Sequence, residues 1–190
     1  MLDRPGFPET SARLCGAELG RYERVALGID PGTAIMGYGL VAIVKDKLKL
    51  IDYGALTTPS GLPLAKRLQR LYDGLLDIIR SRKPNEVAVE ELFFSKNART
   101  ALAVGQARGV AILAAANCGL PVSEYTPLAI KRAIAGYGRA QKEQVQQMVR
   151  VLLDLHVVPE PDDAADALAL AICHLHHSTA ARLIQEYAVE

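Results

Sequence analysis

Short apolar runs, each bounded by turn-forming or charged residues, open the patterned part of this chain. Residues 25–29 form the first run, which ends at Asp30 and is followed by the turn pair Pro31-Gly32. A second run covers residues 37–44 and a third covers residues 48–56, with a short charged segment between them. Runs of this length joined by turns are typical of β-strands. The pattern therefore predicts an opening meander of three strands.

A helical period follows the meander. Over residues 64–78, leucine and isoleucine recur at spacings of three and four, and Lys83-Pro84-Asn85 predicts the end of that helix. Two short segments, at 87–90 and 122–125, indicate further strands. The remaining helical patterns cover residues 98–117, 127–135, 141–155 and a last segment from Asp162-Asp163 to about His177. Helices that alternate with strands after a meander predict an α/β protein with a mixed sheet covered by helices.

Length and composition add the domain organisation. The 190 residues, half of them hydrophobic, are enough for one domain with a sizeable core. Residues 1–24 show no clean period, so we expect a flexible extension, a folded domain over 25–180 and a tail over 181–190. Three cysteines lie far apart, which argues against a disulfide framework, and no run approaches the roughly 18 apolar residues of a membrane span. We therefore expect reduced thiols and a soluble, cytoplasmic protein.

Four acidic residues stand where the predicted elements place functional groups. Asp30 and Glu90 each end a buried strand, and strand ends are where α/β folds build their sites. Asp163 and Asp166 are three residues apart in the first turns of a helix, so their side chains share one face. Carboxylates without neighbouring His or Cys suit Mg²⁺ or Mn²⁺ rather than Zn²⁺, and a cluster of them can hold two ions. The sequence therefore predicts a metal-dependent nuclease centred on Asp30, with one ion activating a water and the other stabilising the leaving oxygen.

Each of these acidic signals also has a purely structural interpretation. Asp30-Pro31-Gly32 after a strand is often only a turn. Glu90 and Glu91 can be a solvated strand end, and Asp162-Asp163 can cap a helix. Their joint occurrence, in this order along an α/β chain, favours the metal site over the separate interpretations.

Three histidines near the C-terminus, at 174, 176 and 177, form a second candidate cluster. At a rise of 1.5 Å per residue, His174 lies about 12 Å along the helix from Asp166, too far to share an ion with it. We therefore expect these histidines to mark a solvated helix end.

Several motifs occur between residues 25 and 177. In chain order they are Leu27-Gly28-Ile29-Asp30-Pro31-Gly32-Thr33, Gly37-Tyr38-Gly39, Glu90-Glu91-Leu92-Phe93, Lys96-Asn97, Gly105-Gln106-Ala107-Arg108-Gly109-Val110-Ala111 and Asp163-Ala164-Ala165-Asp166-Ala167-Leu168-Ala169. Together they resemble the RuvC-type Holliday-junction resolvases of bacteria. The resemblance implies a ribonuclease-H-like fold, with a mixed five-stranded sheet and helices on both faces. It also implies a homodimer that makes paired, symmetric nicks across a four-way junction, in partnership with the RuvA and RuvB branch-migration proteins.

The resemblance assigns roles to individual acids. By motif position, the catalytic residues and ligands of two Mg²⁺ or Mn²⁺ ions per active site are Asp30, Glu90, Asp163 and Asp166. Glu90 is preferred to Glu91 because it directly follows the short Val-Ala-Val run. Asp162 matches no acid of the family and is interpreted as a helix cap.

Basic residues are concentrated in two stretches, although the net charge is only +1. Residues 66–108 hold nine Lys and Arg against five acids, and residues 131–150 hold five against one. The resemblance places Lys131 and Lys142 near the site, and Arg139 follows a Gly-Tyr-Gly loop whose backbone can approach a phosphate. We therefore expect these three residues to bind DNA, although a solvated helix face is the common alternative for such charge runs.

Two adjacent phenylalanines follow the predicted strand that ends at Glu90. Phe93 matches a residue of the family that stacks on bases at the junction centre, and apolar wedges of this kind separate base steps. The alternative is that it packs in the core or at a dimer interface. We assign Phe93 to DNA and Phe94 to packing.

Three other functions compete with junction cleavage. An ATP-using enzyme of the actin and sugar-kinase type would need a second Asp-x-Gly loop and a longer chain. A non-catalytic junction-binding module would be expected to lack one or more of the four acids. Another ribonuclease-H-like nuclease, acting on RNA or branched DNA, would keep all four acids and is disfavoured only by the resemblance at Phe93 and residues 136–139.

Overall fold

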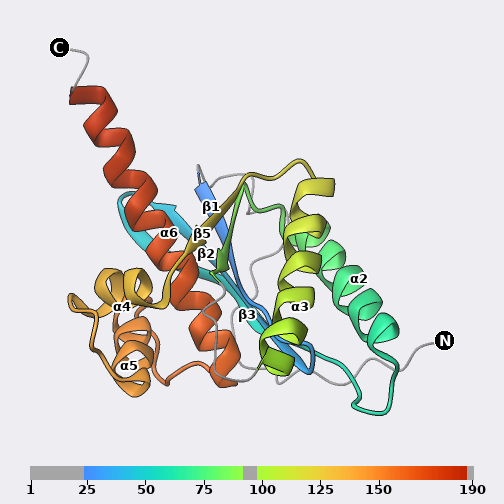
Figure 1. Ribbon diagram of the computed structural model, residues 1–190. Helices are drawn as coiled ribbons and strands as arrows, with labels where there is room; N and C mark the ends of the chain where they lie inside the picture. The colour runs from blue at the N-terminus through green and yellow to red at the C-terminus, as the bar shows by residue number, and fades with distance from the viewer. Residues whose placement is uncertain (1–23, 92–97, 188–190) are drawn as a thin grey trace.

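The computed structural model describes residues 24–91 and 98–187 (Figure 1). The expectations for residues 1–23, for Phe93 and Phe94 and for Cys15 lie outside the described residues. The strands are β1 (Arg24–Asp30), β2 (Ile35–Val44), β3 (Lys47–Thr57), β4 (Glu86–Glu90) and β5 (Val122–Tyr125). The helices are α2 (Leu64–Arg82), α3 (Ala98–Asn117), α4 (Pro127–Ala135), α5 (Lys142–Leu152) and α6 (Asp162–Tyr187).

The five strands form one mixed sheet in the order β3-β2-β1-β4-β5. The opening meander pairs antiparallel, from β1 to β2 and from β2 to β3, and Lys45 and Asp46 make its tight turn with positive φ angles of 49° and 62°. β4 and β5 continue the sheet in parallel with β1. Because β1 and β4 are parallel neighbours, their carboxyl ends meet at one edge, where α/β proteins build their sites.

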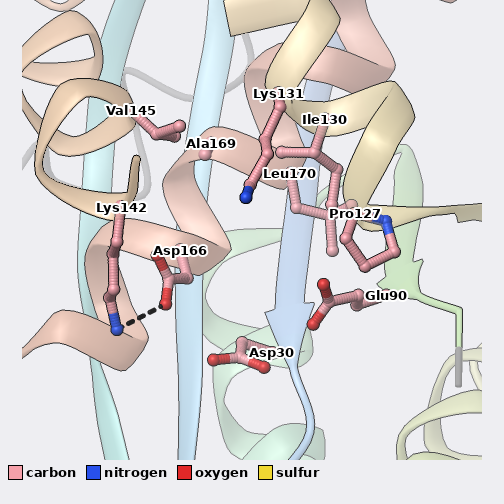
Figure 2. A pocket seen from close by; sticks show the side chains of 10 residues that line it. All are labelled: Asp30, Glu90, Pro127, Ile130, Lys131, Lys142, Val145, Asp166, Ala169 and Leu170. Atoms are coloured by element: carbon pink, nitrogen blue, oxygen red, sulfur yellow. Dashed lines mark ion pairs between the residues drawn. The ribbon is translucent and has the colours of Figure 1, made fainter. Parts of the chain in front are cut away.

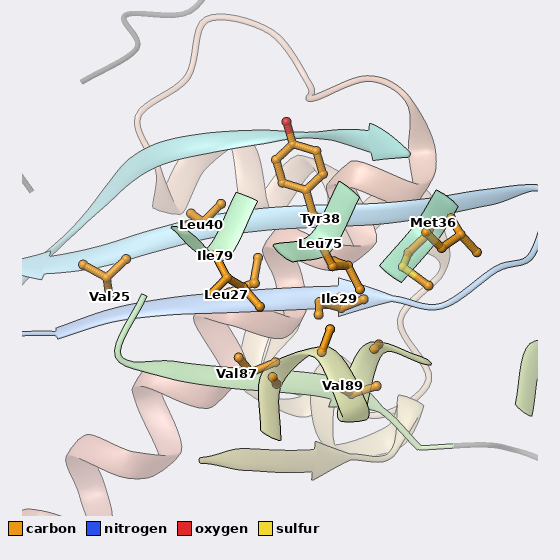
Figure 3. Packing of buried hydrophobic residues seen from close by; sticks show 14 of the residues in the cluster. Val25, Leu27, Ile29, Met36, Tyr38, Leu40, Leu75, Ile79, Val87 and Val89 are labelled. Carbon is orange, nitrogen blue, oxygen red and sulfur yellow. The ribbon is translucent and has the colours of Figure 1, made fainter. Parts of the chain in front are cut away.

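Helices cover both faces of this sheet, as predicted. α2 and α3 pack on one face over the alternate residues of β1, which are large and apolar, as Figure 3 shows: Val25, Leu27 and Ile29. α4, α5 and α6 pack on the opposite face, which has a second core. On that face β1 presents smaller side chains and the first acid: Ala26, Gly28 and Asp30. The period of two along β1 thus directs Asp30 toward α6.

The small residues let α6 lie directly against the sheet backbone. A Cβ added to Gly28 would stand 2.0 Å from the carbonyl oxygen of Ala167, and one added to Gly39 would stand 2.7 Å from the amide nitrogen of Leu168. Gly28 and Gly39 are also paired with each other in the β1–β2 ladder. Only glycine permits so close an approach between a strand and a helix. The position of α6, and of every side chain on its first turns, is therefore set by backbone contact.

The far part of α6 differs from the sequence expectation. The helix continues to Tyr187, ten residues beyond the predicted end and across the predicted boundary at residue 180. The first part of this extension has an anchor that the sequence pattern does not show: Arg24, the first residue of β1, donates to Ser178 and to Thr179. Arg24 is therefore part of the sheet, although the predicted flexible extension included it.

His174 corrects the expectation of a solvated helix end. It is only 4 % exposed, and its Nε2 lies 2.7 Å from Oε2 of Glu86 while its Nδ1 lies 2.9 Å from the hydroxyl of Tyr125. Glu86 also accepts a two-pronged bond from Arg24, at 2.8 and 3.0 Å. His176 and His177 are exposed, as expected.

The state of the cysteines and the limited apolar character of the helices were also predicted from the sequence. Cys118 and Cys173 are free thiols, as predicted. No helix in residues 24–91 or 98–187 combines the length and the apolar character needed to cross a bilayer.

Candidate active site

A pocket of about 240 Å³ opens at the carboxyl ends of β1 and β4, against α4, α5 and α6. Figure 2 shows three of the four predicted acids at this pocket, Asp30, Glu90 and Asp166, with Lys131 and Lys142 on its walls. The rest of its lining is apolar and comes from the three helices: Pro127, Ile130, Val145, Ala169 and Leu170. No motif of the sequence singles out these apolar residues, which lie in predicted helical segments.

Strand register places Asp30 and Glu90 together. The parallel pairing of β1 with β4 runs to Ile29 and Val89, so the two acids are the next residues on neighbouring strands. Val89 contributes to the core under α2 and α3, so Glu90, the next residue, points to the same face as Asp30. Glu91 is exposed and does not line the pocket, in keeping with the preference for Glu90.

The first turns of α6 bring the other two acids. Asp166 lines the pocket, whereas Asp163 does not. Asp163 lies over Gly37, where an added Cβ would stand 1.9 Å from its carbonyl oxygen, and Gly37 is paired with Asp30 across the β1–β2 ladder. The negative charge of Asp163 still reaches Asp30 and contributes to the shift of its pKa.

Burial and mutual repulsion perturb the acids of the pocket. The pKa of Asp30 is raised from 3.8 to about 7, first by burial and then by the charges of Glu90, Asp166 and Asp163. Burial, followed by the charge of Asp166, also raises the pKa of Glu90. Burial likewise raises the pKa of Asp166, although Lys142 opposes the shift. The carboxylates around Asp30 therefore repel one another in a partly buried site, and the neighbouring positive charge does not fully compensate for this repulsion.

Lys142 supplies part of that charge. Its ammonium group lies 3.0 Å from Oδ2 of Asp166 and 3.1 Å from Oδ2 of Asp162, and Figure 2 shows the first of these pairs at the edge of the pocket. Burial disfavours the charged lysine, but hydrogen bonds to Asp166 and Asp162 outweigh it and hold the pKa of Lys142 above its ordinary value. Asp162, interpreted from sequence as a cap, is thus an exposed partner of Lys142 and also accepts from Gln146 at 3.0 Å.

The donor chemistry of the pocket fits a hard divalent cation. Carboxylate oxygens are the ligands that such ions prefer, and a group whose pKa is raised to about 7 by burial and by like charges gains most from a cation. Within residues 24–91 and 98–187, no three His, Cys, Asp or Glu side chains converge closely enough to enclose an ion by themselves. In this arrangement Asp166 is paired with Lys142 rather than turned toward the other acids. Changes of rotamer would have to bring the acids together.

The predicted DNA contacts divide into three groups. Lys131 and Lys142 line the pocket beside the acids. Arg139 is exposed between α4 and α5 and lies outside the lining of the pocket. Phe93 belongs to the residues that the structure does not describe.

Comparison with known proteins identifies the family. The family model described as crossover junction endodeoxyribonuclease RuvC matches residues 26–174. A crossover junction endodeoxyribonuclease RuvC of Chloroflexus aurantiacus is 62 % identical over 151 residues, which cover 80 % of this chain and 92 % of the relative. That of Desulforamulus reducens is 58 % identical over 155 residues, 82 % of this chain and 95 % of the relative.

A solved structure shows the same fold. Thermus thermophilus RuvC, determined in complex with a Holliday junction substrate, superposes with a TM-score of 0.78 and 38 % identity, over 82 % of this chain and 95 % of that one. The predicted ribonuclease-H-like fold is therefore confirmed. The sheet, the acidic pocket at its edge and these similarities lead to one conclusion: the chain belongs to the RuvC family of crossover junction endodeoxyribonucleases, which are metal-dependent nucleases.

Proposed function

We propose that this protein resolves four-way DNA junctions by paired, symmetric nicks during recombination and repair. The observation that carries the chemistry is the pocket that Asp30, a half-buried carboxylate, shares with Glu90 and Asp166; burial and these neighbouring charges raise the pKa of Asp30 to about 7. Such a group is poised to gain a cation at neutral pH, as the two-metal mechanism of phosphodiester hydrolysis requires. The junction as substrate is proposed from the T. thermophilus relative, whose structure contains one.

Asp30, Glu90, Asp163 and Asp166 are the proposed catalytic residues and the proposed ligands of two Mg²⁺ or Mn²⁺ ions per active site. When bound, such ions lower the pKa of a coordinated water and stabilise negative charge on the leaving oxygen. Asp30 is central because the charges of the other three acids all contribute to raising its pKa. Glu90 and Asp166 face it across the pocket, and Asp163 is held beside it by the contact of α6 with Gly37.

The basic residues are proposed to hold the substrate backbone. Lys131 and Lys142 lie on the walls of the pocket and would attract the phosphate next to the acids. Arg139, exposed beyond the pocket, would contact a phosphate farther along the strand. Phe93 is proposed, from the resemblance alone, to stack on bases at the junction centre. If phosphates dominate binding, the affinity for DNA falls steeply with salt.

Paired nicks require two active sites, so we propose a homodimer. α3 exposes an apolar stripe that fits such a partner: Leu102 is 66 % exposed and Leu113 52 % exposed, with the exposed Gly109 between them. These residues are seven and four positions apart, so they share one helix face. A second copy of α3 packed on this stripe would remove the leucines from water. RuvA and RuvB are proposed as further partners from family membership.

Cleavage of a synthetic four-way junction tests the proposal. With Mg²⁺ or Mn²⁺, the wild type should give symmetric nicks whose products a ligase can seal, and Asp30→Asn should give none. Equal cutting by Asp30→Asn would exclude the metal mechanism. Equal cutting of a linear duplex would exclude junction specificity. Faster cutting of an RNA–DNA hybrid would favour the alternative, a ribonuclease-H-like enzyme of different substrate class.

A further inference from the structure

The peptide unit that follows Glu90 is held from two sides. Its N–H, which belongs to Glu91, donates to the carbonyl oxygen of Tyr125 at 2.9 Å. Its carbonyl, which belongs to Glu90, accepts from Nε of Arg108 at 3.2 Å. The register of β1 with β4 ends at Ile29 and Val89, one residue before Glu90. The bond from Arg108 therefore fixes the backbone of Glu90 just beyond the end of this ladder.

Arg108 joins three elements at this point. It extends from α3, its Nε reaches the end of β4, and its terminal nitrogen forms an ion pair with Glu124 of β5. The arginine side chain is 17 % exposed, whereas that of Glu124 is 45 % exposed. A guanidinium is planar and directs Nε and its terminal nitrogens along fixed, different directions. One arginine thus serves two acceptors, a geometry that the single nitrogen of a lysine does not reproduce.

We propose that Arg108 is a positioning residue for the active site, which acts by fixing the peptide unit after Glu90 and hence the direction of the Glu90 side chain. The inference rests on the proposed role of Glu90 as a metal ligand. Groups that hold a ligand in place contribute to metal affinity without touching the ion, and their loss weakens binding about 10- to 100-fold. Arg108 does not line the pocket, and its bond to the Glu90 carbonyl is its direct connection to a pocket residue.

Two other roles for Arg108 give different expectations. If Arg108 only ties α3 to β5 through Glu124, its removal lowers stability and leaves metal affinity unchanged. If Arg108 binds a DNA phosphate, its removal raises the KM for the junction and reduces the salt dependence of binding. Neither role alters the binding of a metal ion to the free protein.

The experiment compares Arg108→Lys with Glu124→Gln and measures the binding of Mn²⁺ alone by calorimetry. Arg108→Lys keeps the positive charge near Glu124 and loses the planar donor to Glu90. We expect its Mn²⁺ affinity to fall about tenfold, with a lower kcat and an unchanged KM on the junction. Glu124→Gln breaks the ion pair and keeps the bond to Glu90, so its Mn²⁺ affinity should stay within about twofold of wild type. Arg80→Lys, an exposed arginine of α2, is the matched control.

Each remaining outcome overturns the inference. Arg108→Lys with wild-type Mn²⁺ affinity excludes the positioning role, whether or not its Tm or its KM changes. A large loss in Glu124→Gln assigns the effect to the ion pair instead. Glu90→Gln serves as the reference: if it binds Mn²⁺ normally, the proposed ligand role of Glu90 fails and the inference fails with it. If only Glu90→Gln weakens Mn²⁺ binding, the proposed function stands without Arg108.

Discussion

The backbone of Gly37 touches the first turn of α6, so that a Cβ on Gly37 would stand 1.9 Å from the carbonyl oxygen of Asp163. The same glycine is the partner of Asp30 in the β1–β2 ladder. One residue without a side chain therefore sets the separation between an acid on the sheet and an acid on the helix. The distance between the backbones of Asp30 and Asp163 is therefore set by backbone packing and does not depend on side-chain rotamers.

Gly37→Ala should damage activity more than stability. The methyl group must push α6 away from β2, and overpacking of this kind costs about 1–3 kcal/mol. A displacement of about 1 Å at a catalytic group can lower the rate about 100-fold. Denaturant unfolding and junction cleavage measure the two effects. Gly61→Ala, where an added Cβ meets nothing within 4 Å, should leave both unchanged. Full activity in Gly37→Ala would contradict the packing argument.

Asp30→Asn should stabilise the metal-free protein at alkaline pH. The pKa of Asp30 is about 7 in the folded state against 3.8 as its ordinary value, so the folded protein holds this proton more tightly than the unfolded chain. The stability that the proton contributes is complete below pH 3.8 and is lost as the pH rises through 7. Since one pKa unit corresponds to about 1.4 kcal/mol, the variant should gain at least about 1 kcal/mol at pH 8.

Thermal unfolding in EDTA at pH 5 and pH 8 checks this expectation. The gain of Asp30→Asn over wild type should be larger at pH 8 than at pH 5, and it should vanish when Mg²⁺ stabilises the wild type. An equal gain in stability at both pH values would show that the pKa of Asp30 is not raised in the folded protein.

Lys142→Gln should destabilise the metal-free protein, because it removes the ammonium group that Asp166 and Asp162 share. Without that charge, the repulsion around Asp166 is less compensated, so the pKa of Asp166 should rise further. We expect a lower Tm in EDTA at pH 8 and a loss of junction cleavage at any Mg²⁺ concentration. Lys47→Gln, an exposed lysine at the start of β3, is the control. If both variants melt alike in EDTA, the ion pairs of Lys142 contribute nothing to the metal-free state.

His174→Ala should lower stability and leave the chemistry intact. The change empties a buried position and deprives Glu86 and Tyr125 of a partner, which together cost about 2–4 kcal/mol. The hydrogen bond from His174 is the main cause that lowers the pKa of Glu86, aided by Arg24 and opposed by burial. The stability from this ionised Glu86 is present above pH 4.5 and is lost as the pH falls through its lowered pKa.

Unfolding at pH 7 and at pH 3 measures this contribution. The difference between wild type and His174→Ala should be largest at pH 7, while junction cleavage at low temperature should match wild type. His176→Ala, on the exposed side of the same helix, should melt like the wild type. Equal destabilisation by the two substitutions would contradict the anchoring role of His174.

Leu113→Glu should prevent the proposed dimer, because it places a charge within the apolar stripe of α3, on one of its two exposed leucines. Sedimentation should show a monomer for the variant and a dimer for the wild type, and paired nicking should be lost. Val157→Glu changes an equally apolar side chain, 71 % exposed and away from α3, and should remain dimeric. A dimeric Leu113→Glu protein would place the interface elsewhere.

The sequence alone determined the order and type of the described strands and helices, with most boundaries within a few residues. It also picked out Asp30, Glu90, Asp163 and Asp166, because strand ends and helical spacing are local properties of the chain. Periods of two and of 3.6 residues need no knowledge of distant partners. The end of α6 is the largest error: the helix continues beyond His177, where Ser178 contacts Arg24, a residue 154 positions earlier in the chain.

Only the tertiary structure decided which side chains meet. The partners of His174, of Lys142 and of the Glu90 carbonyl come from elements far apart in the chain, so no local period predicts them. α6 runs against β4 with Asp166 near Glu90 and His174 near Glu86: eight helical residues span about 12 Å and four strand residues about 13 Å. Because these two lengths are nearly equal, the acidic pocket lies at one end of β4 and the buried contact between His174 and Glu86 lies at the other. This arrangement depends on the glycines that let the helix lie on the sheet, and so on packing rather than on pattern.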